Sequence, residues 1–235
     1  MVDASVARDA LRRCVLFGHV DDAGLDACVA SLRSRHFRRD ETVFHQGDPG
    51  GGLHVIVEGR VKIVLPSPDV TEPAILTTLG PGAFFGELAL LDGEAHSASA
   101  IAVEQTETVV LGREAFDRLL DEQPALRRAL LAALAGELRR LTGHVEGLHF
   151  LDLAGRLASR IADLVETSSS PGPGRAGGER RVAWPFTQAE LAGMIGGSRE
   201  SVNRILNDFT ARGLLRFERD TLVVPDPAAL AEVGR

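Results

Sequence analysis

The sequence predicts an α+β protein with an N-terminal β-roll of the jelly-roll type, a long helix and a C-terminal winged helix-turn-helix. Three observations support this fold class. Glycine turns recur between about residues 37 and 112 at the spacing of a small all-β barrel. An apolar seam with spacings of three and four then marks a helix. Near the C-terminus, two capped helices joined by Gly196-Gly197 precede a hairpin. We therefore expect domains at residues 1–112, 113–149 and 150–235.

Composition and charge limit the class of protein. The chain has 235 residues, enough for two domains, and no apolar run that approaches the roughly 20 residues of a membrane span. Its start lacks the pattern of a signal peptide. Two cysteines are too few for a disulfide framework or a four-ligand iron–sulfur cluster, so we expect a cytoplasmic protein. The net charge of −7 means that any contact with DNA must come from a local basic patch.

The first 36 residues are predicted to be helical. Leu11 and Cys14, and then Leu25 and Cys28, recur at helical spacing. Both cysteines fall on apolar faces, and we interpret them as small buried hydrophobic residues rather than metal ligands.

A candidate phosphate-and-sugar cradle lies in residues 84–98. The pattern predicts a strand end, a glycine turn, one helical turn, a polar loop and a new strand. Gly86 lets the backbone approach a bound group, and the amides that follow suit an anion. The carboxylate of Glu87 suits a sugar hydroxyl. The alternative is an acidic surface loop. The residues of the predicted cradle are Gly86, Glu87, Leu88, His96 and Ser97.

Residues 113–149 are predicted to be a long helical stretch that Pro124 breaks or restarts. The seam can pair two subunits or pack against the chain's own barrel. Its strict spacing favours pairing between subunits. The seam residues are Leu131, Leu134, Leu138, Leu141, Val145 and Leu148.

A hinge is predicted where the seam ends, at Phe150, Leu151 and Asp152. Asp152 is a good N-cap for the next helix, so the chain changes direction there. Residues 167–178 are of low complexity and are predicted to form a flexible loop.

The C-terminal unit has the pattern of a winged helix-turn-helix. Residues 182–186 are expected to form a short edge strand, and residues 214–224 a β-hairpin. Thr187 and Glu190 form a capping box, and Ser198 caps a second helix after the glycine turn.

This order of elements resembles the CRP/FNR family of bacterial transcription regulators from about residue 15 to residue 225. Residues 85–91 resemble its phosphate-binding cassette, residues 150–152 its hinge, and residues 198–206 the recognition helix of the cyclic-AMP receptor branch. The resemblance implies a homodimer that binds double-stranded DNA, contacts RNA polymerase and is gated allosterically by a cyclic nucleotide bound between the β-roll and the long helix.

The second helix of the predicted motif carries base-reading chemistry. Arginine reads guanine bidentately and glutamate accepts from cytosine, so Arg199, Glu200 and Arg204 predict G·C-rich contacts. The resemblance implies a TGTGA half-site. The alternative is a solvated charged face. We also expect Asn203 to bind DNA, because it lies with Arg199 and Glu200 at the N-terminal end of the helix that enters the major groove. Thr187, Gln188 and Ser198 are expected to hold phosphates.

The predicted effector-binding residues depart from the family's pattern at two places. His96 stands where the resemblance places an arginine for the cyclic phosphate, and Leu141-Thr142 where it places a Thr-Ser pair for the adenine. Histidine makes no fork, and leucine cannot hydrogen-bond a base. Three readings stay open: a purine cyclic nucleotide such as cyclic AMP, which we favour; another effector such as a cyclic dinucleotide; or no small effector. No motif supports a haem or another prosthetic group.

Two other classes of protein remain as alternatives. One is a cyclic-nucleotide-binding module whose C-terminal unit binds protein; the base-reading residues argue against it. The other is an enzyme. The sequence contains no nucleophile–base constellation and no metal-ligand spacing, so we predict neither catalysis nor a metal site.

Overall fold

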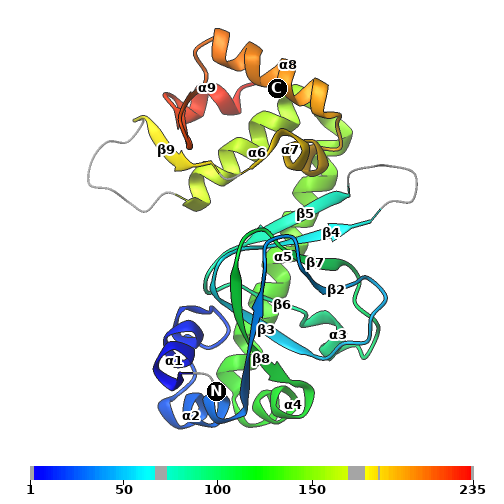
Figure 1. Ribbon diagram of the computed structural model, residues 1–235, viewed down its shortest axis with the longest axis vertical. Helices are drawn as coiled ribbons and strands as arrows, with labels where there is room; N and C mark the ends of the chain where they lie inside the picture. Colours follow the sequence, from blue (N-terminus) through cyan, green and yellow to red (C-terminus); the bar gives the residue numbers. More distant parts are fainter. Residues whose placement is uncertain (1–2, 67–72, 169–177, 185, 234–235) are drawn as a thin grey trace. The chain divides into compact units, whose positions relative to one another are not determined.

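The computed structural model describes residues 3–66, 73–168, 178–184 and 186–233. The chain divides into two compact units, Met1–Arg139 and Arg140–Arg235. The elements, most of which are labelled in Figure 1, are in chain order α1 (Ala4–Arg13), α2 (Asp22–Ser31), β1 (Leu32–Phe37), β2 (Thr42–Phe44), β3 (Gly52–Glu58), β4 (Val61–Leu65), β5 (Ala74–Leu79), β6 (Phe84–Phe85), α3 (Leu88–Leu91), β7 (Ser99–Ala102), β8 (Thr106–Gly112), α4 (Arg113–Glu122), α5 (Pro124–Phe150), α6 (Leu153–Ser168), β9 (Arg180–Ala183), α7 (Gln188–Ile195), α8 (Arg199–Ala211), β10 (Arg216–Glu218), β11 (Thr221–Val224) and α9 (Pro227–Ala231).

The N-terminal unit is a β-roll of two antiparallel sheets, which confirms the predicted jelly-roll class. One sheet has the strand order β1-β8-β3-β6 and the other β2-β7-β4-β5. Inward residues such as Leu53, Val55 and Val109 are buried, because alternate side chains of a strand point to the same face. Neighbouring strands are mostly far apart in the chain, so long-range pairings hold the cradle loop in place.

Helices α1, α2 and α4 pack on β3 and β8 and extend the core of this unit. Cys14 and Cys28 are both buried there as free thiols, as their apolar positions predict. Burial raises the pKa of each thiol to about 11. A thiol with so high a pKa is protonated at neutral pH and unreactive.

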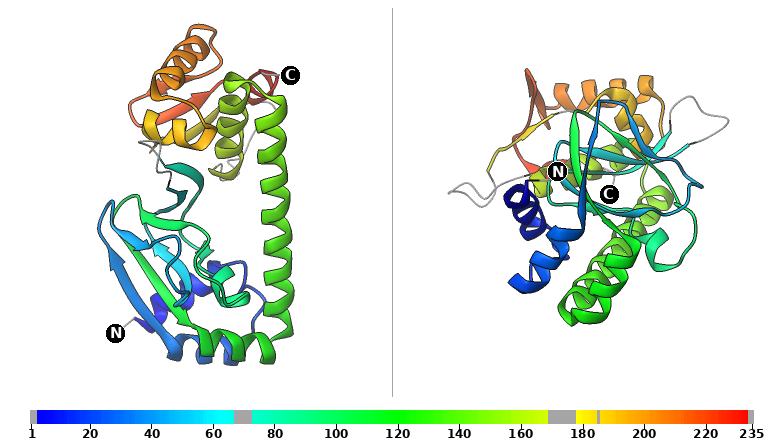
Figure 2. Two further views of the ribbon diagram at one scale, coloured as in Figure 1. Left: turned by 90° about the vertical axis from the view of Figure 1, so that its right-hand side faces the viewer. Right: turned by 60° about the horizontal axis from the view of Figure 1, so that its bottom comes forward.

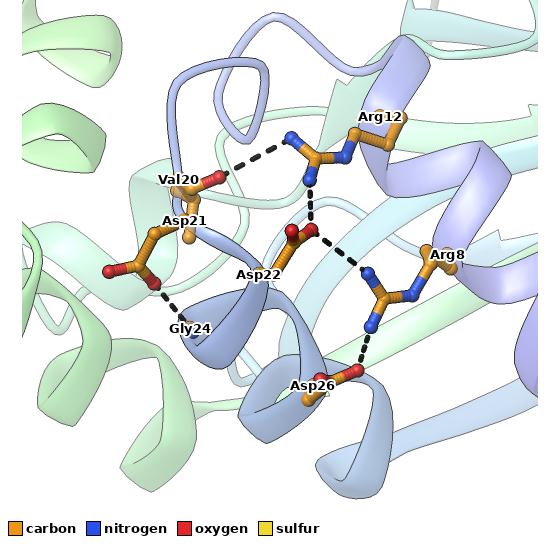
Figure 3. Close-up of polar contacts among 7 residues, drawn as sticks. All are labelled: Arg8, Arg12, Val20, Asp21, Asp22, Gly24 and Asp26. Atoms are coloured by element: carbon orange, nitrogen blue, oxygen red, sulfur yellow. Dashed lines mark hydrogen bonds and ion pairs between the residues drawn. The ribbon is translucent and has the colours of Figure 1, made fainter.

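Ion pairs between arginines and aspartates join α1 to α2 (Figure 3). Arg8 contacts both Asp22 and Asp26, and Arg12 contacts Asp22. Asp21 caps α2 by accepting a hydrogen bond from the amide of Gly24 at 2.7 Å. The aspartates are exposed, so each pair stabilises the fold only weakly.

The expectation that residues 1–36 are helical is wrong at its end. The second helix ends at Ser31, and residues 32–37 form β1, which pairs with β8 in an antiparallel register. Leu32 and Ser34 are half-buried, whereas Arg33 and Arg35 are exposed. This period of two is that of a strand with one solvated face, and pairing with β8 outweighs the helical pattern of the preceding residues.

Pro124 separates α4 from α5, as predicted. The proline opens α5, where its missing amide hydrogen costs nothing because the first turn of a helix has no partner for it. Figure 2 shows α5 as one continuous helix. Its first two turns bury Leu126 and Leu130 in the core of the N-terminal unit, and Leu134 packs partly against that core.

Beyond Leu134, the seam of α5 is exposed in the single chain. The exposed fraction is 66% for Leu138, 53% for Val145 and 46% for Leu148. The start of the helix therefore packs on its own barrel, whereas the apolar side chains of the remaining seam are largely exposed in the single chain.

The C-terminal unit is a winged helix-turn-helix, again as predicted. Its sheet has the order β10-β11-β9, with β10 and β11 forming the hairpin. The edge strand lies earlier than expected, at residues 180–183 rather than 182–186, because its register is set by β11. Most of the loop predicted at residues 167–178 lies outside the described residues.

Candidate functional site

The cradle forms where β6 meets the single turn of α3. Gly86 has φ +86°, a left-handed conformation that side chains rarely adopt. A Cβ there would lie 2.9 Å from the carbonyl oxygen of Gly52 and 3.7 Å from Cε1 of His96. The turn thus requires glycine, and the fold brings Gly86 and His96 together although nine residues, including α3, lie between them, as the predicted cradle needs.

Glu87 stands at the N-cap position of α3, but its side chain makes no capping bond to that helix. The residue is half-buried. Burial raises the pKa of its carboxyl; a backbone hydrogen bond lowers it less, and Glu137 raises it further. A partly desolvated carboxylate that does not cap its own helix is suited to accept hydrogen bonds from a hydroxyl group.

The side chain of His96 is packed against the β-roll and is not an exposed cation. Its ring is 7% exposed and stacks on Phe44, with centroids 3.6 Å apart and planes 4° apart. Burial lowers the pKa of His96, and Asp48 opposes this shift. Its backbone amide donates to the carbonyl of Asp48 at 2.9 Å, and its carbonyl accepts from Gly47 at 2.9 Å. His96 is thus held in place by packing and backbone bonds, and neutral imidazole is its favoured form.

An aromatic cluster behind the cradle is a feature that the sequence analysis missed. His54 stacks on Phe85 with centroids 4.9 Å apart, and Phe44 lies 5.8 Å from Phe85. Nδ1 of His54 is 3.1 Å from the hydroxyl of Thr108. Burial, followed by His96 and Arg35, lowers the pKa of His54 to about 4.

The other predicted ligand residues lie at different levels of exposure. Ser97 follows His96 directly and is exposed. Leu88 starts α3 and is 44% exposed. Leu141 and Thr142 lie on α5 in the C-terminal unit, and both are exposed. Their contribution to a pocket with the cradle stays a prediction.

The two helices of the winged motif begin at side-chain caps. Thr187 and Glu190 form the predicted capping box, with the Thr187 amide 2.9 Å from the Glu190 carboxylate and the Glu190 amide 3.2 Å from the Thr187 hydroxyl. Helix α7 ends at Gly196, which has φ +66°. Ser198 then caps α8 by accepting from the amide of Ser201 at 3.2 Å.

Helix α8 divides into a buried and an exposed face. Its apolar residues, including Val202 and Phe209, are buried in the unit. Arg199 and Asn203, and Glu200 and Arg204, are pairs four residues apart, so each pair shares a face. All four are exposed. The structure therefore brings the predicted base-reading residues together on the solvent side of one helix.

A hydrogen bond ties this face to α7. Nε2 of Gln188 donates to Oδ1 of Asn203 at 2.9 Å. The bond fixes the distance between the start of α7 and the middle of the exposed face of α8. Beside it, Trp184 packs edge-on against Phe186 and Phe217 at 5.5 and 5.8 Å, which supports the hairpin next to the two helices.

The predicted hinge lies between α5 and α6. Phe150 ends α5 and is 80% exposed. Asp152 accepts a hydrogen bond from the amide of Gly155 at 2.7 Å and so caps α6. The sequence therefore encodes a break between the two helices at this point.

Two absences hold for the residues that the structure describes. No group of three or more His, Cys, Asp or Glu side chains there could hold a metal ion. Among the same residues, no helix is long and apolar enough to cross a membrane.

Comparison with known proteins gives matches over both units. Residues 34–123 match the family model of the cyclic nucleotide-binding domain, and residues 155–233 match that of the Crp-like helix-turn-helix domain. The chain is 34% identical over 225 residues to the CRP-like cAMP-activated global transcriptional regulator of Mycobacterium tuberculosis, covering 96% of this chain and 98% of that protein. It is 31% identical to the cyclic AMP receptor protein of Thermus thermophilus, covering 93% and 96%.

Solved structures are similar as well. The c-di-GMP responsive global regulator CLP of Xanthomonas campestris has a TM-score of 0.71 at 26% identity, covering 87% of this chain and 99% of that one. FixK2 of Bradyrhizobium japonicum has a TM-score of 0.76 at 22% identity, covering 87% and 98%, and supports the fold alone.

Proposed function

Since the chain belongs to the CRP/FNR family of DNA-binding transcription regulators, we propose that it is a homodimer that reads a TGTGA-type palindrome under the control of a cyclic nucleotide. The family consists of regulators and not of enzymes. The observation that carries the proposal is the exposed face of α8, where Arg199, Glu200 and Arg204 are free to meet base edges. The protein acts on DNA in the cytoplasm, with RNA polymerase as a further partner.

Base reading follows from the chemistry of these three side chains. Arg199 and Arg204 can each grip O6 and N7 of a guanine, and Glu200 can accept from N4 of a cytosine. The helix N-termini capped by Thr187 and Ser198 are proposed to bind backbone phosphates, because their free amides and positive dipole ends favour anions. Two copies of α8 must lie about 34 Å apart to engage successive major grooves of a palindrome.

A gel-shift assay tests the base-reading role. Arg199→Ala should weaken binding to a TGTGA palindrome by about 1–3 kcal/mol and relax the preference at one base pair. Arg212→Ala is the matched control, because Arg212 is an exposed arginine at the other end of the same helix and pairs with Asp208. Equal affinity of Arg199→Ala and the unchanged protein would remove Arg199 from the DNA interface.

The cradle is proposed to bind the effector through backbone and carboxylate. The amides after Gly86 meet the phosphate, Glu87 accepts from the sugar hydroxyl, and Ser97 adds a hydroxyl. Relatives whose names include cAMP support a purine cyclic nucleotide. A cyclic dinucleotide is the second candidate, because the Xanthomonas campestris regulator is described as responsive to c-di-GMP and has a similar fold. The predicted contacts of Leu141 and Thr142 with the base are part of this proposal.

Calorimetric titration of the full chain with cyclic AMP, cyclic GMP and cyclic di-GMP separates these candidates. A binding heat with cyclic AMP alone supports cyclic AMP as the effector, and a binding heat with cyclic di-GMP alone supports the cyclic dinucleotide. Flat traces with all three would leave a regulator that needs no small effector of this class.

Dimerisation is proposed to use the exposed seam of α5. Leu138 and Val145 are more than half exposed in the single chain and lie on one face. Leu138→Glu would place a charge in an apolar interface and should shift the sedimentation of the dimer towards the monomer. Arg139→Glu, on the next residue and another face, is the control. A dimer that withstands Leu138→Glu at micromolar concentration would exclude this interface.

Coupling between effector and DNA is proposed to pass through the hinge at Phe150, Leu151 and Asp152. Occupation of the cradle changes the end of α5 near Gly143 and Gly147, and the hinge then repositions α8. The effector must bind the DNA-competent state more tightly than the other state, since only differential affinity shifts the equilibrium.

If the C-terminal unit bound protein instead of DNA, selection from random DNA duplexes would return no enriched site.

A further inference from the structure

Helix α3, the single turn of the cradle, is too short to be stable by itself. It has four residues, Leu88–Leu91, and the side chain of Glu87 does not cap it. Its last backbone bonds run from the amides of Leu91 and Asp92 to the carbonyls of Glu87 and Leu88, at 3.0 and 3.1 Å. Isolated helices shorter than about 12 residues are marginal in water. Contacts from other elements must therefore fix this turn.

An arginine from α4 binds the C-terminal end of α3. Nη1 of Arg113 donates to the carbonyl of Leu90 at 2.9 Å, and Nη2 donates to the carbonyl of Ala89 at 2.8 Å. The last carbonyls of a helix have no partner inside it, so the guanidinium supplies bonds that α3 itself lacks. Its positive charge also suits the carbonyl end of the turn. Arg113 therefore stabilises α3 both by hydrogen bonding and by charge.

The position of Arg113 in its own helix supports the same role. Arg113 is the first residue of α4, directly after the N-cap Gly112. A cation at the start of a helix interacts unfavourably with the positive end of the helix dipole, where acidic residues are favoured. Because α4 itself does not favour an arginine at this place, the bonds to α3 give a physical reason for the residue type.

A second contact on α3 comes from the loop before β3. A Cβ on Gly50 would lie 2.5 Å from the Cβ of Ala89, so glycine is needed for the backbone of this loop to come so close to the helix. Ala89 is buried by its surroundings, with 2% of its surface exposed. Two elements that are far apart in the chain, the loop at Gly50 and the start of α4, thus fix the same turn.

We propose that Arg113 is a positioning residue for the cradle, which fixes α3 so that the amides after Gly86 face the phosphate of the effector. This inference rests on the proposed binding of a cyclic nucleotide at the cradle. Arg113 acts through α3 rather than on the effector, since both of its terminal nitrogens donate to carbonyls of that helix. Without these bonds, α3 has the binding geometry for only a fraction of the time, and the apparent affinity falls by that fraction.

Hydrogen exchange in the full chain tests the contact without effector. The amides of Leu91 and Asp92, followed by NMR, report the opening of α3. In Arg113→Gln we expect them to exchange about tenfold faster than in the unchanged protein, because two charge-assisted hydrogen bonds are lost. In Arg113→Lys, which keeps the charge but not the fork, we expect a smaller increase.

Arg127→Gln is the matched control. Nη1 of Arg127 also donates to two carbonyls near the end of a helix, those of Leu120 and Asp121 at 2.6 and 3.1 Å, but that helix is α4. The variant removes the same kind of contact from a different helix. Exchange of the α3 amides should therefore stay as it is in the unchanged protein.

Calorimetric titration with cyclic AMP then measures the effect on binding. Arg113→Gln should bind about tenfold more weakly than the unchanged protein, because α3 leaves its binding geometry more often. Arg113→Lys should recover part of this loss, and Arg127→Gln should bind normally. A loss in the Arg113 variants alone separates positioning of the cradle from a general loss of stability. If Arg113→Gln does not fold, Arg113→Lys serves for both measurements.

Three results would overturn the proposal. The first is unchanged exchange of the α3 amides in both Arg113 variants, whatever the effector is. The second is an equal loss of affinity in Arg113→Gln and Arg127→Gln. The third is an equal loss in Arg113→Gln and Arg113→Lys, which would assign the effect to packing rather than to the donors. Flat traces with the unchanged protein would instead contradict the proposed function, and faster exchange in Arg113→Gln would then support the contact of Arg113 with α3 alone.

Discussion

Acid should weaken the N-terminal unit through one histidine. His54 is half-buried against Phe85 and hydrogen-bonded to Thr108. Burial, with His96 and Arg35 nearby, lowers its pKa from 6.5 to about 4. Between these two values the unfolded chain binds a proton that the folded chain does not. Stability is therefore complete above about pH 6.5 and falls as the pH drops towards 4.

The size of the effect follows from the two pKa values. A difference of one in pKa corresponds to about 1.36 kcal/mol. Linkage between 6.5 and about 4 gives a loss of about 2 kcal/mol from pH 7 to pH 5, and of about 3 kcal/mol by pH 4. Solvent screening at a half-buried ring makes these figures upper limits.

Urea unfolding at several pH values measures this loss. The Cε1–H signals of histidines in the N-terminal unit report its unfolding, because the single tryptophan, Trp184, lies in the other unit. His54→Asn removes the titrating group and should flatten the dependence on pH. His45→Asn, at an exposed histidine of the same unit, should keep it. Equal slopes for His54→Asn and the unchanged protein, or a measured His54 pKa near 6.5, would refute the reasoning.

Three further predictions concern the cradle and the helix-turn-helix. Gly86→Ala should weaken cyclic-nucleotide binding at least about tenfold in calorimetry, because the added Cβ would lie 2.9 Å from a backbone oxygen. Gly93→Ala is the control: Gly93 has a similar φ, but a Cβ there would have no atom within 4 Å, so binding should stay near normal. Affinity for cyclic AMP should rise as the pH falls from about 7.5 to 6, because a bound phosphate raises the lowered pKa of His96; an affinity independent of pH would exclude contact with that ring. Thr187→Ala should destabilise the C-terminal unit by about 1 kcal/mol, followed by Trp184 fluorescence, and Thr187→Ser should not.

Local rules predict the C-terminal unit well. The capping box at Thr187, the cap at Ser198 and the left-handed turn at Gly196 each depend on residues within four positions of one another. Such signals are complete in the sequence. The exposed face of α8 follows from the same helix, because its buried positions identify the opposite side.

The start of β1 shows where the same reasoning fails. Leu32 continues the helical spacing of the apolar residues before it, and the strand conformation of residues 32–37 depends on pairing with β8, far along the chain. The period of two in Leu32, Arg33, Ser34 and Arg35 could have identified the strand, but four residues are too short a run to outweigh the preceding helix.

The stack of His96 on Phe44 could not be predicted from the sequence either. The two rings come from the cradle loop and from β2, which meet only when the β-roll has closed. Comparison with the family's motif identifies His96 as a replacement for arginine but not its neutral, packed state. That state depends on desolvation, which is a property of the folded surroundings and not of the loop.

Under the proposed function, the cradle and helix α8 recognise their ligands by different means. Base reading uses the exposed side chains of α8, so a change of residue type changes specificity directly. The cradle uses the backbone path at Gly86, and its one nearby basic ring is packed against Phe44. A phosphate held mainly by amides gains little from side-chain charge, so the effector's sugar and base must supply most of the discrimination. Under this proposal, Glu87 and the predicted contact residues on α5 decide which cyclic nucleotide is selected.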